Sequence, residues 1–454
     1  MKLKLNYKRT FIIGFAFFGI LMLWQVYNTY CPLFLTDLLV KNNPGTTQTD
    51  WQYVVGILMA ADNIFALFML PLFGRLSDKT HTRFGKRMPY IVIGTILSSI
   101  VFPLMVVMFY INSLVGVIIT MGLTLIFMQM YRNPAVSLMP DVTPKPLRSK
   151  ANGIINVVGY IGAILGGALA LVFSFNKIEN KLLLLIPFGI TSLSMIITTL
   201  VLFLRINENK LAEELKDEMT RGEEESDLQE KIVEDAPLSK KNKISLILLI
   251  IAVFLWFASF NSVETFWSGY GVYELNISSY SLFTIILTVA SLAAFMPAAL
   301  LSEKIGRKWT IVIGLALVTA ALVGLIFVGK GPVIDAADPD SLNKASFWLY
   351  PLFILAGIGW AFINCCSYPM FVELASGKNI GTYTGIYYAA SMLAQSVTPV
   401  LAGLLMYFQG AWKILFIYAS IVMGLALLVF LFINNVKAKN VKVKKGLEAL
   451  DVDD

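Results

Sequence analysis

The chain has 454 residues, of which 57% are hydrophobic and only 14% are charged. Soluble domains carry about 25% charged residues, so this composition excludes an ordinary soluble domain. The formal net charge of +7 does not indicate nucleic-acid binding, because most basic residues lie in the segments between long apolar runs.

Twelve apolar runs follow one another, each close to the roughly 20 residues that span a bilayer as a helix. They cover residues 10–31, 51–74, 89–110, 113–139, 152–174, 182–204, 244–270, 279–301, 309–329, 346–372, 382–407 and 412–434. Lipid admits only helices and closed barrels as spanning structures, so we predict an all-α integral membrane protein with twelve transmembrane helices. The first run follows basic residues, as in a signal peptide, but it is long and lacks a clear cleavage site. We therefore expect it to be the first span.

The basic residues indicate the orientation. With the N-terminus inside, this map places 29 of the 36 Lys and Arg residues inside, six outside and one, Arg132, within a span. The positive-inside rule then predicts that both termini are cytoplasmic, in a multi-pass protein of a prokaryotic plasma membrane.

One polar segment, with Glu213-Glu214 and Lys240-Lys241, divides the spans six and six. Its Leu, Glu and Lys spacing favours a partly helical connector, most simply a solvated one without a specific role. The expected divisions are an N-terminal bundle at 1–205, a cytoplasmic linker at 206–243, a C-terminal bundle at 244–436 and a cytoplasmic tail at 437–454.

The two halves share landmarks that indicate an internal repeat. A cationic segment follows the second run and returns in shorter form after the eighth, so Asp78 and Glu303 end corresponding helices. Asp141 and Glu373, after the fourth and tenth runs, each precede a glycine by twelve residues. Repeated bundles are typical of alternating-access carriers, whose substrate binds near the membrane midplane.

These features resemble the major facilitator superfamily over essentially the whole chain. Residues 77–89 read Ser-Asp-(x5)-Phe-Gly-Lys-Arg-x-Pro, an expanded loop similar to that of the glycoside–pentoside–hexuronide:cation symporters and of sucrose–proton symporter-like proteins. Pro134, Asp141, Arg148 and Asn152 are similar to the region joining the fourth and fifth helices of sucrose carriers. The resemblance implies the two-bundle major facilitator fold and import of a glycoside, such as sucrose, maltose or a related glucoside, by proton symport.

Two ionisable residues, Asp62 and Arg132, lie well inside predicted spans. A charge at the bilayer centre costs about 2.5–3.5 kcal/mol on insertion scales, so such groups face a cavity or a partner. We expect either a coupling site, in which Asp62 takes up a proton and Arg132 modulates its affinity, or a static ion pair between the second and fourth helices. The resemblance argues against sodium, because Ala66, Leu70 and Arg132 stand where sodium-coupled relatives carry acids. The expected coupling ion is therefore a proton, and no other cofactor or metal is expected.

Polar and aromatic side chains at one-face helical spacing suit a sugar, which offers hydroxyl groups and flat C–H faces. The resemblance implies that the first, fourth and fifth helices of each bundle line the cavity. The alternative for each residue is helix packing, to which a polar side chain contributes about 1 kcal/mol. The candidate substrate-binding residues are Trp24, Tyr27, Asn28, Gln129, Arg132, Asn133, Asn156, Tyr160, Asn261, Glu264, Asn364, Tyr368 and Tyr387.

Charged residues at the predicted cytoplasmic helix ends form a candidate gate. Surface ion pairs are individually weak, but several together can bias an equilibrium between two conformations. For Lys79 and Lys86, topology determination explains the charge equally well. The candidate gate residues are Asp78, Arg83, Arg87, Asp141, Arg148, Glu303, Arg307 and Glu373.

The sequence contains no evident catalytic constellation or phosphate-binding loop, so enzyme activity is not expected. The expected partners are a small-molecule sugar and the lipid bilayer, without nucleic acid, and the expected state is a monomer. Two alternatives stay open. One is an efflux carrier for amphiphilic molecules, whose site would be apolar. The other is a non-transporting sugar sensor, which would be expected to carry a larger cytoplasmic extension.

Overall fold

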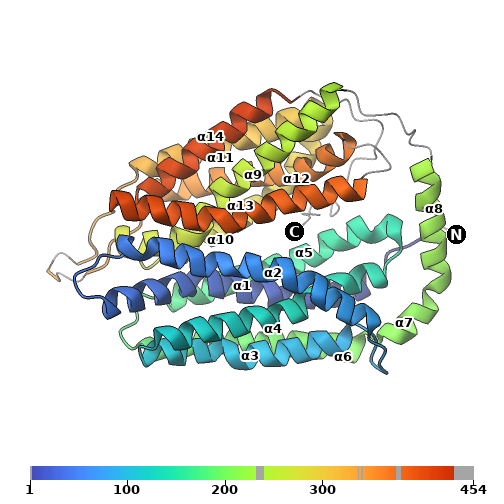
Figure 1. Ribbon diagram of the computed structural model, residues 1–454, viewed down its shortest axis with the longest axis horizontal. Coiled ribbons are helices and arrows are strands. Elements are labelled where there is room, and N and C mark those ends of the chain that lie inside the picture. Colours follow the sequence, from blue (N-terminus) through green and yellow to red (C-terminus); the bar gives the residue numbers. More distant parts are fainter. Residues whose placement is uncertain (1–2, 232–239, 336, 339–340, 375–379, 434–454) are drawn as a thin grey trace.

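The computed structural model consists of two helical bundles lying side by side, α1–α6 and α9–α14, with α7 and α8 in the linker (Figure 1). The structure describes residues 3–231, 240–335, 337–338, 341–374 and 380–433, without the side chains of residues 62, 67, 225–231, 240–242, 372–374 and 380–382. The helices are α1 (Tyr7–Asn42), α2 (Gln52–Lys79), α3 (Met88–Tyr110), α4 (Leu114–Asp141), α5 (Arg148–Val172), α6 (Leu185–Arg205), α7 (Glu208–Glu214), α8 (Lys216–Lys231), α9 (Lys240–Gly269), α10 (Tyr280–Ile305), α11 (Arg307–Phe327), α12 (Leu349–Leu374), α13 (Ile380–Gln409) and α14 (Ile414–Leu431).

Among the described residues, twelve helices are long and apolar enough to cross a membrane, which confirms the predicted number of spans. Several helices run beyond the apolar runs. α1 has 36 residues, and its start is capped by Asn6, whose side chain accepts a hydrogen bond from the Arg9 N–H. α2 continues to Lys79, so Asp78 lies in its last turn.

The two bundles repeat one packing pattern. In the first bundle, α1 packs against α5 and α6, α3 packs against α4 and α6, and α2 packs against α4. The corresponding helices of the second bundle form the same pairs: α9 with α13 and α14, α11 with α12 and α14, and α10 with α12. The repeat seen in the sequence is therefore also a repeat of three-dimensional packing.

The linker is docked under the first bundle, and we call this end of the molecule the linker end. The Glu208 carboxylate accepts hydrogen bonds from the backbone N–H groups of Arg87, at 2.9 and 3.2 Å, and of Met88, at 3.3 Å. Glu208 is only 4% exposed. Most of α7 is exposed, as predicted for a solvated connector, but its first residue, Glu208, has a specific contact because it caps the N-terminus of α3.

The second linker helix, α8, crosses the linker end at a steep angle to the bundle helices (Figure 1). It packs against η2 (Lys145–Leu147), which joins α4 to α5. A Cβ atom on Gly222 would lie 2.9 Å from the Pro144 side chain. The linker thus contacts both loops that bound the first bundle at this end.

The bundles meet along two related seams, α2 against α13 and α5 against α10. In the first seam, a Cβ atom on Gly56 would lie 2.2 Å from the carbonyl oxygen of Pro399, and one on Gly403 would lie 2.4 Å from that of Gln52. Because glycine has no side chain, the two backbones come into direct contact here.

Hydrogen bonds across the interface gather toward the opposite end, which we call the far end. The Gln25 Nε2 group donates to Thr284 Oγ1 at 3.3 Å, the Tyr273 hydroxyl donates to the Leu33 carbonyl oxygen at 3.3 Å, and the Phe175 N–H donates to the Tyr280 hydroxyl at 3.2 Å. Together with the glycine seam, these contacts close the molecule at the far end.

Candidate functional site

A cavity lies between the two bundles, and we call it the central cavity. Its volume is about 280 Å³. α1 and α5 supply one wall, and α9, α10, α11 and α12 supply the other. Five predicted substrate-binding residues line it together: Trp24, Asn28, Tyr160, Glu264 and Asn364.

Aromatic rings form a large part of the lining of the central cavity, in both walls. Trp360 stacks on Phe260 with ring centroids 3.7 Å apart. Trp24 meets Tyr27 edge-on at 5.6 Å. Trp267 is held in place by a hydrogen bond from its Nε1 to the Tyr280 carbonyl oxygen at 2.8 Å. Fixed aromatic faces provide flat apolar platforms for a ligand.

Amide side chains enter the cavity from both bundles. α1 contributes Gln25 and Asn28, and α12 contributes Asn364. The Asn364 Nδ2 group donates to the Trp360 carbonyl oxygen at 3.1 Å, which fixes the direction of the amide. An amide offers donors and acceptors on one group, so these residues suit a ligand that carries hydroxyl groups.

α10 adds a row of hydroxyl groups that the sequence analysis missed: Ser281, Thr284, Thr288 and Ser291. Their spacing of i, i+3, i+7 and i+10 places them on one helical face, so the signal was present in the sequence. The prediction did not include this row, because the resemblance implies a cavity lined by the first, fourth and fifth helices of each bundle, and α10 is the second helix of its bundle. Gln25 of α1 lies between the predicted residues Trp24 and Tyr27 but was not itself predicted.

Two serine hydroxyls in the lining are buried without a hydrogen-bond partner among the described residues. Ser268 is 5% exposed and Ser281 is 1% exposed. An unsatisfied buried hydroxyl costs about 1–3 kcal/mol. Both residues belong to the lining of the central cavity, but their hydroxyl oxygens are buried within its wall.

The charged residue in the lining of the central cavity is acidic. Glu264 is exposed on the cavity side of α9, whereas the described lining residues include no Lys, Arg or His. Such a wall is compatible with a neutral or cationic ligand. It offers no counter-ion to a ligand's carboxylate or phosphate.

A second cavity, which we call the inner cavity, lies between the central cavity and the linker end. Its volume is about 450 Å³. Leu21 lines both cavities. The predicted residues Arg132, Asn133 and Asn156 line the inner cavity, and Tyr388 of α13 faces them from the second bundle. The structure thus divides the predicted site between two successive cavities.

The remaining predicted substrate-binding residues line neither cavity. Tyr27 and Gln129 are buried within the first bundle, and the Asn261 Nδ2 group donates to the Phe257 carbonyl oxygen of its own helix at 2.9 Å. The Tyr368 and Tyr387 hydroxyls pair with Thr384 at 3.3 Å and Ser367 at 2.9 Å. The side chain of Asp62, the predicted coupling residue, lies outside the described part of the chain.

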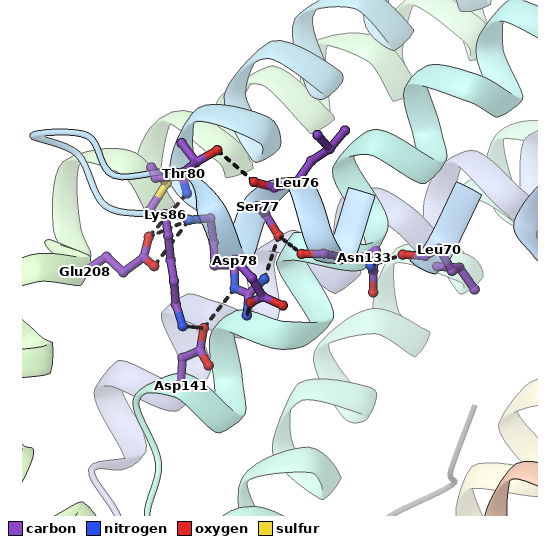
Figure 2. Close-up of polar contacts among 12 residues, drawn as sticks. Leu70, Leu76, Ser77, Asp78, Thr80, Lys86, Asn133, Asp141 and Glu208 are labelled. Carbon is purple, nitrogen blue, oxygen red and sulfur yellow. Dashed lines mark hydrogen bonds and ion pairs between the residues drawn. The ribbon is translucent and has the colours of Figure 1, made fainter. Parts of the chain in front are cut away.

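Two predicted gate residues, Asp78 and Asp141, lie at the linker end of the first bundle beside Lys86 and Glu208 (Figure 2). Arg87 joins them: its guanidinium lies 2.5 Å from Asp78, 2.8 Å from Asp141 and 2.5 Å from the Ser77 hydroxyl. Lys86 lies 3.1 Å from Asp141.

The Arg87 guanidinium stays charged in this network. Burial alone would lower the pKa of Arg87, but its hydrogen bond to Asp141 and the charges of Asp141 and Asp78 raise that pKa overall. The ion pairs tie the ends of α2 and α4 to the start of α3. They lie within one bundle and do not cross the mouth between the bundles.

The other predicted gate residues have separate environments. Arg148 donates from Nε to the Thr143 carbonyl oxygen and from Nη2 to that of Pro140, both at 3.1 Å, and so caps the end of α4. Arg83 lies over the Phe84 ring at 4.6 Å. Glu303 is exposed, Arg307 begins α11, and the Glu373 side chain lies outside the described residues.

The twelve spans, the repeated bundles and the cavities between them define a two-bundle membrane transporter. A family model described as the Major Facilitator Superfamily matches residues 10–331 and 272–451, and the chain belongs to that family. No curated protein matches the sequence.

Solved structures share the fold at low sequence identity. A POT family transporter in complex with a thioalcohol-conjugated peptide is 14% identical, with 94% of this chain and 95% of that chain covered and a TM-score of 0.65. A variant of the nucleoside transporter NupG is 13% identical, with 93% and 99% covered and a TM-score of 0.65. A bacterial homologue of the human lysosomal transporter Spinster, in an inward-facing and occupied conformation, is 14% identical, with 94% and 97% covered and a TM-score of 0.63. At these identities the likeness concerns the fold alone.

Proposed function

We propose that the protein imports a neutral glycoside, such as a disaccharide, by proton symport with alternating access. The linker end is then the cytoplasmic end, because the loops and linker there hold most of the basic residues. The glycine seam and the hydrogen bonds between the bundles at the far end correspond to the state in which the outer side is closed.

The central cavity is the observation that carries this proposal. Its stacked Trp360, its amides from Asn28 and Asn364 and its row of α10 hydroxyls match the flat C–H faces and hydroxyl groups of a sugar. A peptide with a free carboxylate would favour a basic residue in the wall. None of the described lining residues is basic.

The inner cavity supports a proton-linked exit route. Arg132 of α4 lines the inner cavity, between the central cavity and the linker end. A proton that leaves the central region toward the linker end would pass close to its charge. We keep Asp62 as a proposed proton carrier whose affinity Arg132 modulates. Asp62→Asn is expected to lower proton-driven accumulation more than exchange, and full proton-driven uptake by Asp62→Asn would remove Asp62 from the mechanism.

Counterflow in proteoliposomes tests the substrate class. Vesicles loaded with unlabelled compound are given trace labelled disaccharide, monosaccharide, dipeptide or nucleoside, with and without a pH gradient. We expect exchange of a disaccharide. Exchange of the dipeptide or nucleoside together with no exchange of any glycoside would refute the proposal.

A matched pair of tryptophan variants tests the site. Trp360→Ala removes the stacked platform, and we expect it to raise the half-saturation concentration about 3- to 10-fold, equivalent to roughly 0.5–1.5 kcal/mol for an aromatic contact. Trp309→Ala is the control, because Trp309 is exposed and lines neither cavity. Equal effects of both substitutions would contradict the assigned site.

A further inference from the structure

The central cavity and the inner cavity meet at one side chain of α1. Among the described residues, Leu21 is the one that lines both cavities. Its neighbours on α1 divide on either side of it: Phe17 and Ile20 line the inner cavity, whereas Trp24 and Gln25 line the central cavity. Leu21 therefore stands at the boundary between the two spaces.

The same boundary falls on α5, which packs against α1. Asn156 lines the inner cavity, Tyr160 lines the central cavity, and Gly159 lies between them in the chain. A Cβ atom on Gly159 would lie 2.7 Å from Leu21 Cδ1 and 3.4 Å from Leu21 Cγ. The Leu21 side chain thus rests in the notch that glycine leaves on α5.

An apolar side chain in this place can block a passage without binding what passes. Leu21 is half-buried, and its branched end has no hydrogen bond to break when it turns between rotamers. Its displacement from the notch costs only the apolar contacts that it makes there. A polar ligand gains no hydrogen bond from leucine, so the boundary forms a barrier rather than a second binding site.

We propose that Leu21, seated against Gly159, forms a constriction that a ligand passes on its way from the central cavity to the inner cavity. The inference rests on the proposed function for the route of transport, but not for the identity of the transported compound. The side chain at position 21 then sets the rate of passage, while the polar groups of the central cavity hold the ligand. A smaller side chain speeds passage in both directions.

The first measurement needs no substrate. Thr288→Cys places a thiol in the lining of the central cavity, and Val136→Cys places one in the lining of the inner cavity, on the linker-end side of Leu21. N-ethylmaleimide is added to the purified protein in detergent, and the rate of modification is followed by mass spectrometry. The chain without these substitutions reports the reaction of its three native cysteines.

We expect Leu21→Ala to speed the modification of Thr288→Cys about tenfold, equivalent to lowering a barrier by about 1.4 kcal/mol. The modification of Val136→Cys should keep its rate, because the reagent reaches the inner cavity without passing Leu21. Leu165→Ala is the matched control, since Leu165 is exposed on α5 and lines neither cavity.

Gly159→Ala gives the opposite test. Its added Cβ atom would displace Leu21 away from α5, further into the space between the cavities. We therefore expect slower modification of Thr288→Cys. Combining Gly159→Ala with Leu21→Ala removes the clash, so the double variant should regain the rate of Leu21→Ala, as residues in direct contact show non-additive effects.

The outcomes separate the two proposals. Absence of glycoside exchange in the wild type refutes the proposed function, whereas the modification rates still test the constriction. Modification of Thr288→Cys that is no faster in Leu21→Ala, or that Leu165→Ala speeds equally, overturns the inference and leaves glycoside transport intact. If Gly159→Ala does not fold, the double variant decides: a rate no higher than that of the chain with native Leu21 and Gly159 overturns the proposal.

Discussion

The docked linker makes a quantitative prediction at Glu208. Its carboxylate accepts hydrogen bonds from the Arg87 and Met88 N–H groups, which are among the donors that a helix leaves unpaired in its first turn. Glu208→Ala removes the acceptor and leaves both donors buried. Glu208→Gln keeps an acceptor oxygen but removes the charge.

The magnitude follows from these contacts. Loss of an N-cap acceptor costs about 0.5–2 kcal/mol, and loss of a hydrogen bond to a buried charged group costs about 1.5–3 kcal/mol. We expect Glu208→Ala to destabilise the first bundle by about 2–3 kcal/mol. Glu208→Gln should cost only about 0.3–1 kcal/mol, which is the contribution of a negative charge at a helix N-terminus.

Thermal unfolding of the purified protein in detergent is the assay. For a unit of about 200 residues, 1 kcal/mol shifts Tm by roughly 2–4 °C, so Glu208→Ala should lower Tm by about 4–12 °C. Glu213→Ala is the control, because Glu213 is exposed on the same helix. A Tm decrease for Glu208→Ala no larger than that for Glu213→Ala would refute the capping role.

Three further predictions follow from described contacts. Arg87→Lys should lower stability by about 1–3 kcal/mol in the same unfolding assay, because an ammonium cannot contact Ser77, Asp78 and Asp141 together. Since the pKa of Arg87 is raised, the stability contributed by its positive charge is present at lower pH values and is lost as pH rises through the guanidinium range. Gly56→Leu should separate α2 from α13 and increase labelling of a cysteine introduced at Tyr53, whereas Gly122→Leu, whose Cβ meets nothing within 4 Å, should not. Thr284→Val, which removes the hydroxyl bonded to Gln25, should weaken binding of the transported compound about 2- to 10-fold by tryptophan fluorescence, whereas Thr319→Val on α11, outside the cavity, should not.

The spans could be predicted from the sequence, because a run of about 20 apolar residues pairs its backbone polar groups within lipid by forming a helix. The ion pair between Asp141 and a basic residue of the expanded loop was also predictable, since both lie at the same end of the first bundle. The charge pattern does not show which basic residue pairs with Asp141, because Arg83 and Arg87 carry the same charge. In the structure, Arg83 lies over the Phe84 ring, and Arg87 pairs with Asp141. Gly85, which lies between them, has a φ of +109°, a turn conformation that the charge pattern does not reveal.

The candidate site was only partly predictable. Periodicity shows that polar residues share a helical face, but it does not show which neighbour that face meets. Gln129 and Arg132 lie one turn apart on α4, yet Gln129 is 1% exposed and Arg132 lines the inner cavity. The burial of Glu208 depends on contacts with Arg87 and Met88, far away in the chain, which no local pattern reveals.

The backbone contact of Gly56 with Pro399 and of Gly403 with Gln52 has a consequence for the energetics of opening. A long side chain that becomes ordered in an interface loses up to about 2 kcal/mol of rotamer entropy, whereas glycine loses none. At these two positions, closure of the seam therefore costs no side-chain entropy of the glycines. In the alternating-access cycle proposed above, such contacts lower the entropic cost of closing the seam.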